Sequence, residues 1–128
     1  MHDRTRYARG ADFERKVRDH CMHDLDATYV VRSAGSRGIV DLVVFFAGED
    51  VIEGELDTGA KFALTMPVVW LVQCKRDGRL SAEDRELLTS LAAETGATPY
   101  LAFIGPSGLE LEEVSANAQA EATDIRPA

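Results

Sequence analysis

The sequence predicts an α/β protein in which helices flank a mixed β-sheet, with elements in the order α-β-β-β-α-β-β. Three observations support this prediction. A length of 128 residues with 45% hydrophobic content is typical of one globular domain with one core. Two segments repeat apolar residues at helical spacing, and five short runs are apolar and rich in β-branched residues, as strands are. The chain has no internal repeat and no glycine-rich phosphate loop of the Walker type.

The N-terminal region divides into an arm and a helix. Residues 1–9 are basic, and we expect them to form a flexible arm. A first helix is predicted from Ala11 to His23, because apolar residues recur there at every fourth position: Phe13, Val17 and Cys21. The single domain is then expected to span residues 10–114.

Five strands are predicted, at residues 28–32, 40–46, 68–75, 98–104 and 109–114. A glycine-punctuated turn, SAGSRG, separates the first two, and GPSG joins the last two. The segment 47–66 mixes acidic residues, short apolar pieces and three glycines. We interpret it as an irregular insertion or a ragged hairpin.

A second helix is expected after the third strand. Ser81 can cap its N-terminus with Asp84 at the capping-box position, and Gly96 can end it. Its apolar stripe consists of Leu87, Leu88, Leu91 and Ala92. Residues 115–128 offer little to bury, so we expect a disordered tail.

The charge distribution is uneven. The net charge is -8, yet the segment from Arg4 to Arg18 holds six basic residues against two acidic ones. A polyanion responds to the local field of a surface as well as to the total charge, so DNA remains a possible ligand. The candidate phosphate contacts are Arg9, Arg15, Arg37, Arg76 and Arg79.

The location expected from the sequence is the cytoplasm of a prokaryotic cell or of a virus-infected host. No apolar run is long enough to span a bilayer, and the N-terminus lacks the apolar core of a secretion signal. Cys21 and Cys74 fall in a predicted helix and a predicted strand, which argues against a disulfide scaffold. His20, Cys21 and His23 could also bind zinc, but one such cluster favours an ordinary helix face.

Three polar residues lie at the ends of predicted strands. Asp41 enters an otherwise apolar strand, while Gln73 and Lys75 leave another strand on the same face. If these strands pair as a hairpin, the three side chains meet at one end of the sheet. Carboxylate and amide oxygens suit magnesium, and a lysine can orient water or offset charge on a phosphate. This set indicates phosphodiester hydrolysis.

Further residues complete this candidate site. Glu14 lies on the first helix, and Arg32 and Ser36 flank the glycine turn, where a phosphate can be held. Simpler interpretations also exist. Glu14 can form a helical ion pair with Arg18, Asp41 can cap a turn, Lys75 can extend to solvent, and an amide at a strand end needs no special role.

The ordered segments GADFERKVRDH, VVRSAGSRGIVDLVVF, WLVQCK and GATPYLAF resemble the archaeal-type Holliday junction resolvase family of the PD-(D/E)XK nuclease superfamily. The resemblance covers residues 10–103 and implies a restriction-endonuclease-like fold. It also implies a homodimer that cuts four-way DNA junctions with Mg²⁺, for which Mn²⁺ can substitute. We expect the second helix or the C-terminal strands to form the dimer interface.

The resemblance assigns roles residue by residue. Glu14 and Asp41 would bind the metal, Lys75 would be the catalytic lysine, and Arg32 and Ser36 would face the junction. Gln73 stands where the family has an acid, so it would be a neutral metal ligand, and one metal ion would bind in place of two.

Two further departures from the family are visible. Val40 replaces the proline before the motif aspartate, and segment 47–66 is longer and more acidic than the expected turn. Three functions therefore remain open. They are a junction endonuclease of recombination, replication or repair, a restriction-type or modification-dependent endonuclease, and a nuclease-fold module that binds DNA without cutting it.

Overall fold

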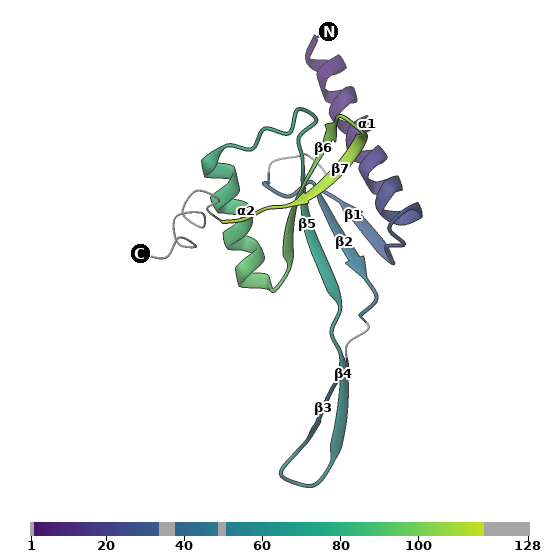
Figure 1. The fold of residues 1–128 in the computed structure, drawn as a ribbon, viewed down its shortest axis with the longest axis vertical. Helices are drawn as coiled ribbons and strands as arrows, with labels where there is room; N and C mark the ends of the chain where they lie inside the picture. The colour runs from purple at the N-terminus through teal and green to yellow at the C-terminus, as the bar shows by residue number, and fades with distance from the viewer. Residues whose placement is uncertain (1, 34–37, 49–50, 117–128) are drawn as a thin grey trace.

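The computed structural model describes the backbone of residues 2–33, 38–48 and 51–116, with side chains from residue 10 onward in these ranges. A five-stranded sheet has one helix on each face, and a two-stranded hairpin projects from one end of the sheet (Figure 1). The elements are α1 (His2–His23), β1 (Tyr29–Arg32), β2 (Leu42–Phe46), β3 (Val51–Glu55), β4 (Lys61–Thr65), β5 (Val68–Cys74), α2 (Ala82–Thr95), β6 (Thr98–Gly105) and β7 (Gly108–Glu113). Neither helix is long and apolar enough to cross a membrane, as far as the described residues extend.

The mixed sheet is confirmed, but the predicted element order is wrong by two strands. The strand order is β1-β2-β5-β6-β7, and only β5 and β6 are parallel. Two neighbouring parallel strands must be joined by a long crossover, and α2 forms the crossover between β5 and β6. The additional strands are β3 and β4, which pair only with each other.

The first helix begins nine residues earlier than predicted. It starts at His2, so residues 2–9, expected as a flexible arm, are helical. Arginine is a good helix former, and a basic segment can extend a helix without any apolar stripe of its own. The expected tail falls outside the described residues from position 117 onward.

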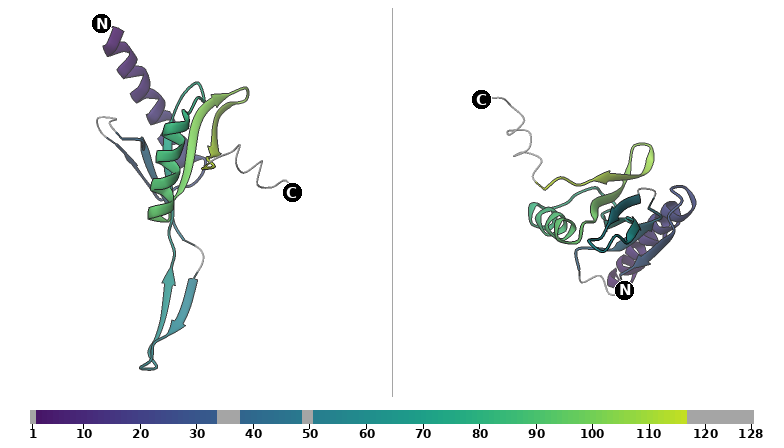
Figure 2. Two further views of the ribbon diagram at one scale, coloured as in Figure 1. Left: turned by 90° about the vertical axis from the view of Figure 1, so that its left-hand side faces the viewer. Right: turned by 90° about the horizontal axis from the view of Figure 1, so that it is seen from below.

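The helices cover opposite faces of the sheet (Figure 2, right). Alternate residues of β2 and β5 point to opposite faces, so each strand contributes to two clusters. One cluster unites α1 with the sheet through Phe13, Val17, Cys21, Leu42, Val44 and Val72. The other unites α2 with the sheet through Leu71, Leu88, Ala92, Leu101 and Val114.

The predicted ends of α2 are confirmed. The hydroxyl of Ser81 accepts a 3.0 Å hydrogen bond from the backbone N–H of Asp84. Gly96 adopts a left-handed conformation with φ of 76°, which glycine tolerates without steric cost, and donates to the carbonyl of Ala92.

The hairpin β3–β4 is more regular than expected for segment 47–66. Five consecutive residues pair across it, from Val51 with Thr65 to Glu55 with Lys61. The ring of Phe62 lies over Gly54 on the facing strand, where a Cβ would be only 2.2 Å from the ring. This aromatic cover compensates for the missing side chain of the glycine.

The hairpin does not simply extend the main ladder. The β2–β5 register sets Phe46 opposite Val68, whereas the hairpin sets Val51 opposite Thr65. The β2 side therefore carries two more residues than the β5 side between these pairs. The two backbones approach so closely at this junction that a Cβ on Gly48 would overlap the carbonyl of Met66.

Candidate active site

Asp41 and Gln73 lie at the same end of the sheet, on two neighbouring strands. The β2–β5 register ends with Leu42 opposite Val72, and Asp41 and Gln73 are the next residues along the two chains. Asp41 stands one residue before β2, yet its backbone still bonds both neighbours: its N–H donates to Val72 and its carbonyl accepts from Ser33. The expected meeting of these strands is thus confirmed.

The side-chain oxygen of Gln73 is the most unusual atom of this site. Gln73 is only 6% exposed, and its Oε1 is buried with no hydrogen-bond partner among the described residues. Leaving a buried acceptor unpaired costs about 1–3 kcal/mol. An oxygen in this state is suited to coordinating a cation or to accepting a bond from a ligand.

Glu14 reaches the same place from α1. Glu14 is 9% exposed, and its Oε1 lies 3.3 Å from Nε of Arg32. The simpler pairing of Glu14 with Arg18 is not what the structure has, because Arg18 contacts Asp19 at 3.2 Å. Arg32, expected to face DNA, therefore holds the helix carboxylate in position.

Lys75 follows the end of β5 and completes the group. A pocket of about 360 Å³ is lined by all four predicted catalytic residues, Glu14, Asp41, Gln73 and Lys75, together with Gly38, Ile39, Cys74, Asp84 and Leu87. The backbone N–H of Lys75 donates to the carbonyl of Ala102, which fixes the strand end on β6. The four residues thus surround one open space.

Burial changes the ionisation of both carboxyl groups. Burial raises the pKa of Asp41 above its ordinary value, although the N–H of Cys74 and the charge of Lys75 oppose this. Burial also raises the pKa of Glu14, and the negative charge of Asp41 raises it further, while Arg32 acts in the opposite direction. Two partly desolvated carboxylates that repel each other favour a bound cation.

The residues present fit a magnesium ion. Glu14, Asp41 and Gln73 offer oxygen atoms only, which Mg²⁺ prefers, and the unpaired Oε1 of Gln73 needs a positive partner. Among the side chains that the structure describes, no three His, Cys, Asp or Glu residues form a metal cluster. The side-chain oxygens that line this pocket belong to Glu14, Asp41, Gln73 and Asp84.

The HCMH segment is better described as part of a helix face. Cys21 is buried in the core, and burial raises the pKa of its thiol to about 11. His20 bonds through Nδ1 to Oδ2 of Asp24 at 2.7 Å.

The predicted DNA contacts are only partly described. Arg15 is exposed and pairs with Asp12 at 3.2 Å, whereas Arg76 lines a second pocket together with Glu14 and Cys74. Arg9 lies in α1, and its side chain is not among those described. Ser36 and Arg37 fall outside the described residues.

Two residues of α2 belong to the pocket and were missed as site residues. Asp84 was interpreted only as part of the helix cap, and Leu87 only as part of an apolar stripe, yet both line the pocket. An acidic residue in the first turn of the helix that follows Lys75 was the available signal.

No protein-family model matches this chain, and a search of curated proteins also finds no match. The assignment of a function therefore depends on the geometry of the pocket.

Proposed function

We propose that this protein is a magnesium-dependent endonuclease that cleaves phosphodiesters in branched DNA. One observation carries the proposal: the buried Oε1 of Gln73 has no hydrogen-bond partner among the described residues and borders a pocket shared with Glu14, Asp41 and Lys75. A structural cluster would satisfy this oxygen internally, whereas a site for a cation leaves it free.

Each residue has a task in this proposal. Glu14, Asp41 and Gln73 would hold the metal ion, which when bound polarises a phosphate and lowers the pKa of water. The N–H of Cys74 orients the Asp41 carboxylate, and Arg32 orients that of Glu14. The ammonium group of Lys75 orients the attacking water and offsets negative charge on the phosphoryl oxygens as one P–O bond breaks.

The DNA backbone would approach the same end of the sheet. Arg76 borders the adjoining pocket beside Glu14, so its guanidinium can bind a phosphate next to the scissile one. The preference for branched DNA depends on the resemblance of the ordered motifs to Holliday junction resolvases. In a homodimer, two sites would address the two equivalent strands of a four-way junction.

The test is cleavage of a labelled four-way junction beside a linear duplex with the same arms. The reactions contain Mg²⁺, Mn²⁺ or a chelator, and they compare the wild type with Asp41→Asn. Asp57→Asn is the matched control, because Asp57 is exposed in the hairpin turn. We expect metal-dependent cuts near the crossover that persist in Asp57→Asn and disappear in Asp41→Asn.

Other outcomes identify the alternatives. Equal cutting of the linear duplex would indicate a restriction-type or modification-dependent endonuclease without junction specificity. Tight junction binding without cleavage in either metal would indicate a DNA-binding module and would refute the enzymatic proposal.

A further inference from the structure

The hairpin β3–β4 carries one apolar face that nothing in the described chain covers. The register places four large side chains on this face, because residues paired across two strands point the same way. These residues, here called the hairpin face, are Ile52, Leu56, Phe62 and Leu64. Each of them is exposed, and none belongs to either core cluster.

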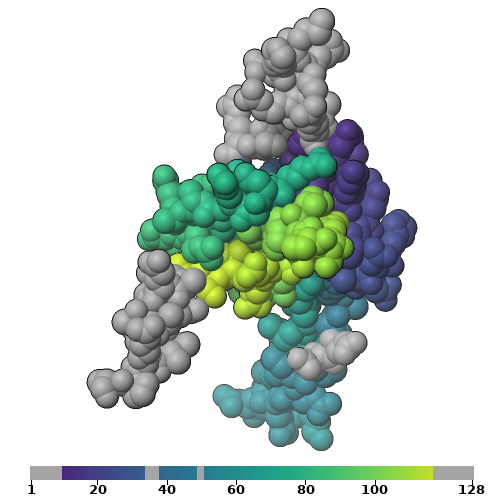
Figure 3. All heavy atoms as spheres, turned by 45° about the horizontal axis from the view of Figure 1, so that its top comes forward, coloured from purple at the N-terminus to yellow at the C-terminus, as the bar shows by residue number. Residues whose placement is uncertain are grey.

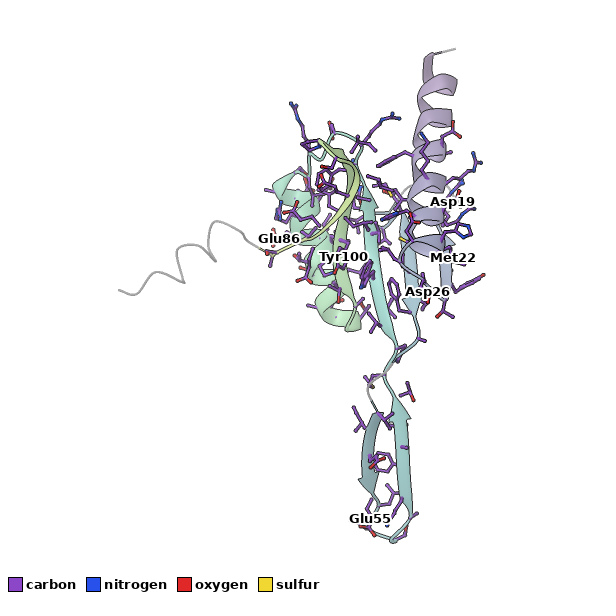
Figure 4. All side chains as sticks on the ribbon, turned by 45° about the vertical axis from the view of Figure 1, so that its right-hand side comes forward. Asp19, Met22, Asp26, Glu55, Glu86 and Tyr100 are labelled. Carbon is purple, nitrogen blue, oxygen red and sulfur yellow. The ribbon has the colours of Figure 1, made fainter. Side chains whose placement is uncertain are left out.

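An element that projects into solvent does not usually expose four large apolar side chains on one face. The hairpin stands away from the sheet (Figure 3), and Glu55 lies near its tip (Figure 4). An isolated two-stranded hairpin is marginally stable in water and needs an apolar partner surface. The hairpin face is therefore expected to be covered in the functional assembly.

A second apolar surface of the same chain is also open. Alternation along β1, β2 and β5 places four residues on the side of the sheet that faces α2, and these form the sheet face: Tyr29, Val31, Phe45 and Val69. The helix packs on β5 and β6, and among the described residues no helix packs on β1 and β2 from this side (Figure 2, left). Tyr29 is consequently 61% exposed.

We propose that the hairpin face of one copy of this chain binds the sheet face of a second copy, reciprocally, about a two-fold axis. Such a contact covers both open surfaces of both copies with one symmetry operation. It also differs from the interfaces expected from sequence, which involve α2 or the C-terminal strands.

The area available is adequate for a stable dimer. The eight side chains of the two surfaces expose roughly 500 Å² per copy, judged from the size of aliphatic and aromatic residues. Since only about 60% of an interface is apolar, a reciprocal contact would bury about 1,600 Å² in total. A standard specific interface has this size.

The charges of the hairpin favour protein over DNA as the occupant. Glu53, Glu55 and Asp57 accompany the apolar residues, and Lys61 is the one cation in strands β3 and β4. Glu53 and Glu55 point to the opposite face from Phe62, so they remain in solvent when the hairpin face is covered. A phosphate backbone would be repelled by the same carboxylates.

The experiment measures the mass of the full chain in solution by light scattering and sedimentation, at micromolar concentrations. We expect twice the 14.0 kDa chain mass for the wild type. Leu64→Glu should weaken self-association roughly 100-fold or more and give a monomer, because a charge would be buried without a partner. Glu53→Gln, on the opposite face, is the matched control and should stay dimeric.

Mixing identifies the reciprocal contact. Tyr29→Glu alone should also be monomeric, but a mixture with Leu64→Glu retains one intact contact and should form mixed dimers. Circular dichroism and thermal unfolding verify the fold of each variant, and Leu64→Ser repeats the test with a milder change. A monomeric wild type, or a dimer that survives these hairpin substitutions, would overturn the proposal. A hairpin variant that remains dimeric but no longer binds DNA would also overturn the proposal. None of these results depends on nuclease activity.

Discussion

The backbone N–H of Cys74 donates a 2.7 Å hydrogen bond to Oδ2 of Asp41, across 33 positions of sequence. This bond ties the residue before β2 to the end of β5 and holds a carboxylate at the pocket that Gln73 also lines. The position of Asp41 is thus fixed by the backbone of the neighbouring strand. Asparagine at this position keeps an acceptor oxygen for the same N–H, which makes Asp41→Asn a conservative test.

Asp41→Asn should reduce the pH dependence of stability in the absence of divalent metal. Because burial raises the pKa of Asp41, the folded protein binds this proton more tightly than the unfolded chain does. Wild-type stability should therefore fall as the pH rises from about 4 through the raised pKa. Thermal unfolding in chelator should show a shallower fall for the variant, with part of the slope left by Glu14. An unchanged slope would contradict the assignment, and Asp57→Asn serves as the control.

Gln73→Leu should separate folding from cation binding. The lost oxygen makes no hydrogen bond to the described residues, so the free energy of unfolding in chelator should equal that of wild type or exceed it by about 1–3 kcal/mol. The increase in Tm produced by Mg²⁺ should disappear, because stabilisation by a ligand requires its binding site. If Mg²⁺ raised the Tm of this variant as much as that of wild type, Gln73 would not be a ligand of the metal ion.

Gln73→Glu should have the opposite effect on the metal. A further carboxylate beside Glu14 and Asp41 adds negative charge to the pocket and should tighten Mg²⁺ binding by about tenfold, which corresponds to about 1.4 kcal/mol. In chelator the same variant should be less stable at neutral pH, since three buried carboxylates repel one another. Magnesium titrations followed by thermal unfolding measure both effects, and unchanged affinity would argue against a cation between these side chains.

Arg32→Gln should shift the acid limb of metal-dependent activity to higher pH. The guanidinium of Arg32 lowers the pKa of Glu14, so its removal should raise that pKa. Glu14 would then lose its proton only at a higher pH. A pH profile of cleavage, or of the Mg²⁺-induced rise in Tm, measures this shift. Arg18→Gln is the matched control on the same helix, because Arg18 contacts Asp19 and not Glu14. Equal profiles for the two variants would exclude Arg32 as a positioning residue.

Leu88→Ala and Leu87→Ala should differ sharply although the residues are adjacent. Leu88 is fully buried between α2 and the sheet, and its truncation should cost about 2–5 kcal/mol of unfolding free energy. Leu87 is largely exposed at the rim of the pocket, so its truncation should change stability by about 0.5 kcal/mol or less. Denaturant unfolding provides the comparison, and similar losses would contradict the position of α2 on the sheet.

Most elements of the fold could be predicted because their patterns are local. The apolar stripe of α2 and its Ser81 and Gly96 ends are determined by residues within the helix itself. The start of α1 was predicted wrongly because residues 2–9 have no apolar periodicity, and periodicity was the evidence used. The hairpin was underestimated because its alternating pattern contains Gly54, whose effect is offset by Phe62 on the facing strand.

The candidate site could be predicted to a similar extent. Asp41, Gln73 and Lys75 lie together because strand alternation and one antiparallel pairing are sufficient to join them. The partner of Glu14 could not be predicted, since Arg32 reaches it through the packing of α1 on β1. The burial of the Gln73 oxygen is likewise a property of the assembled sheet.

The two-residue offset at the base of the hairpin makes this segment a separable module. The β2–β5 ladder is complete at Phe46 and Val68, before the hairpin ladder begins. Insertions, deletions or exchange of residues 51–65 therefore leave the pairing of β2 with β5 unchanged. Selection, or a protein engineer, can alter the projecting segment in length and sequence independently of the pocket.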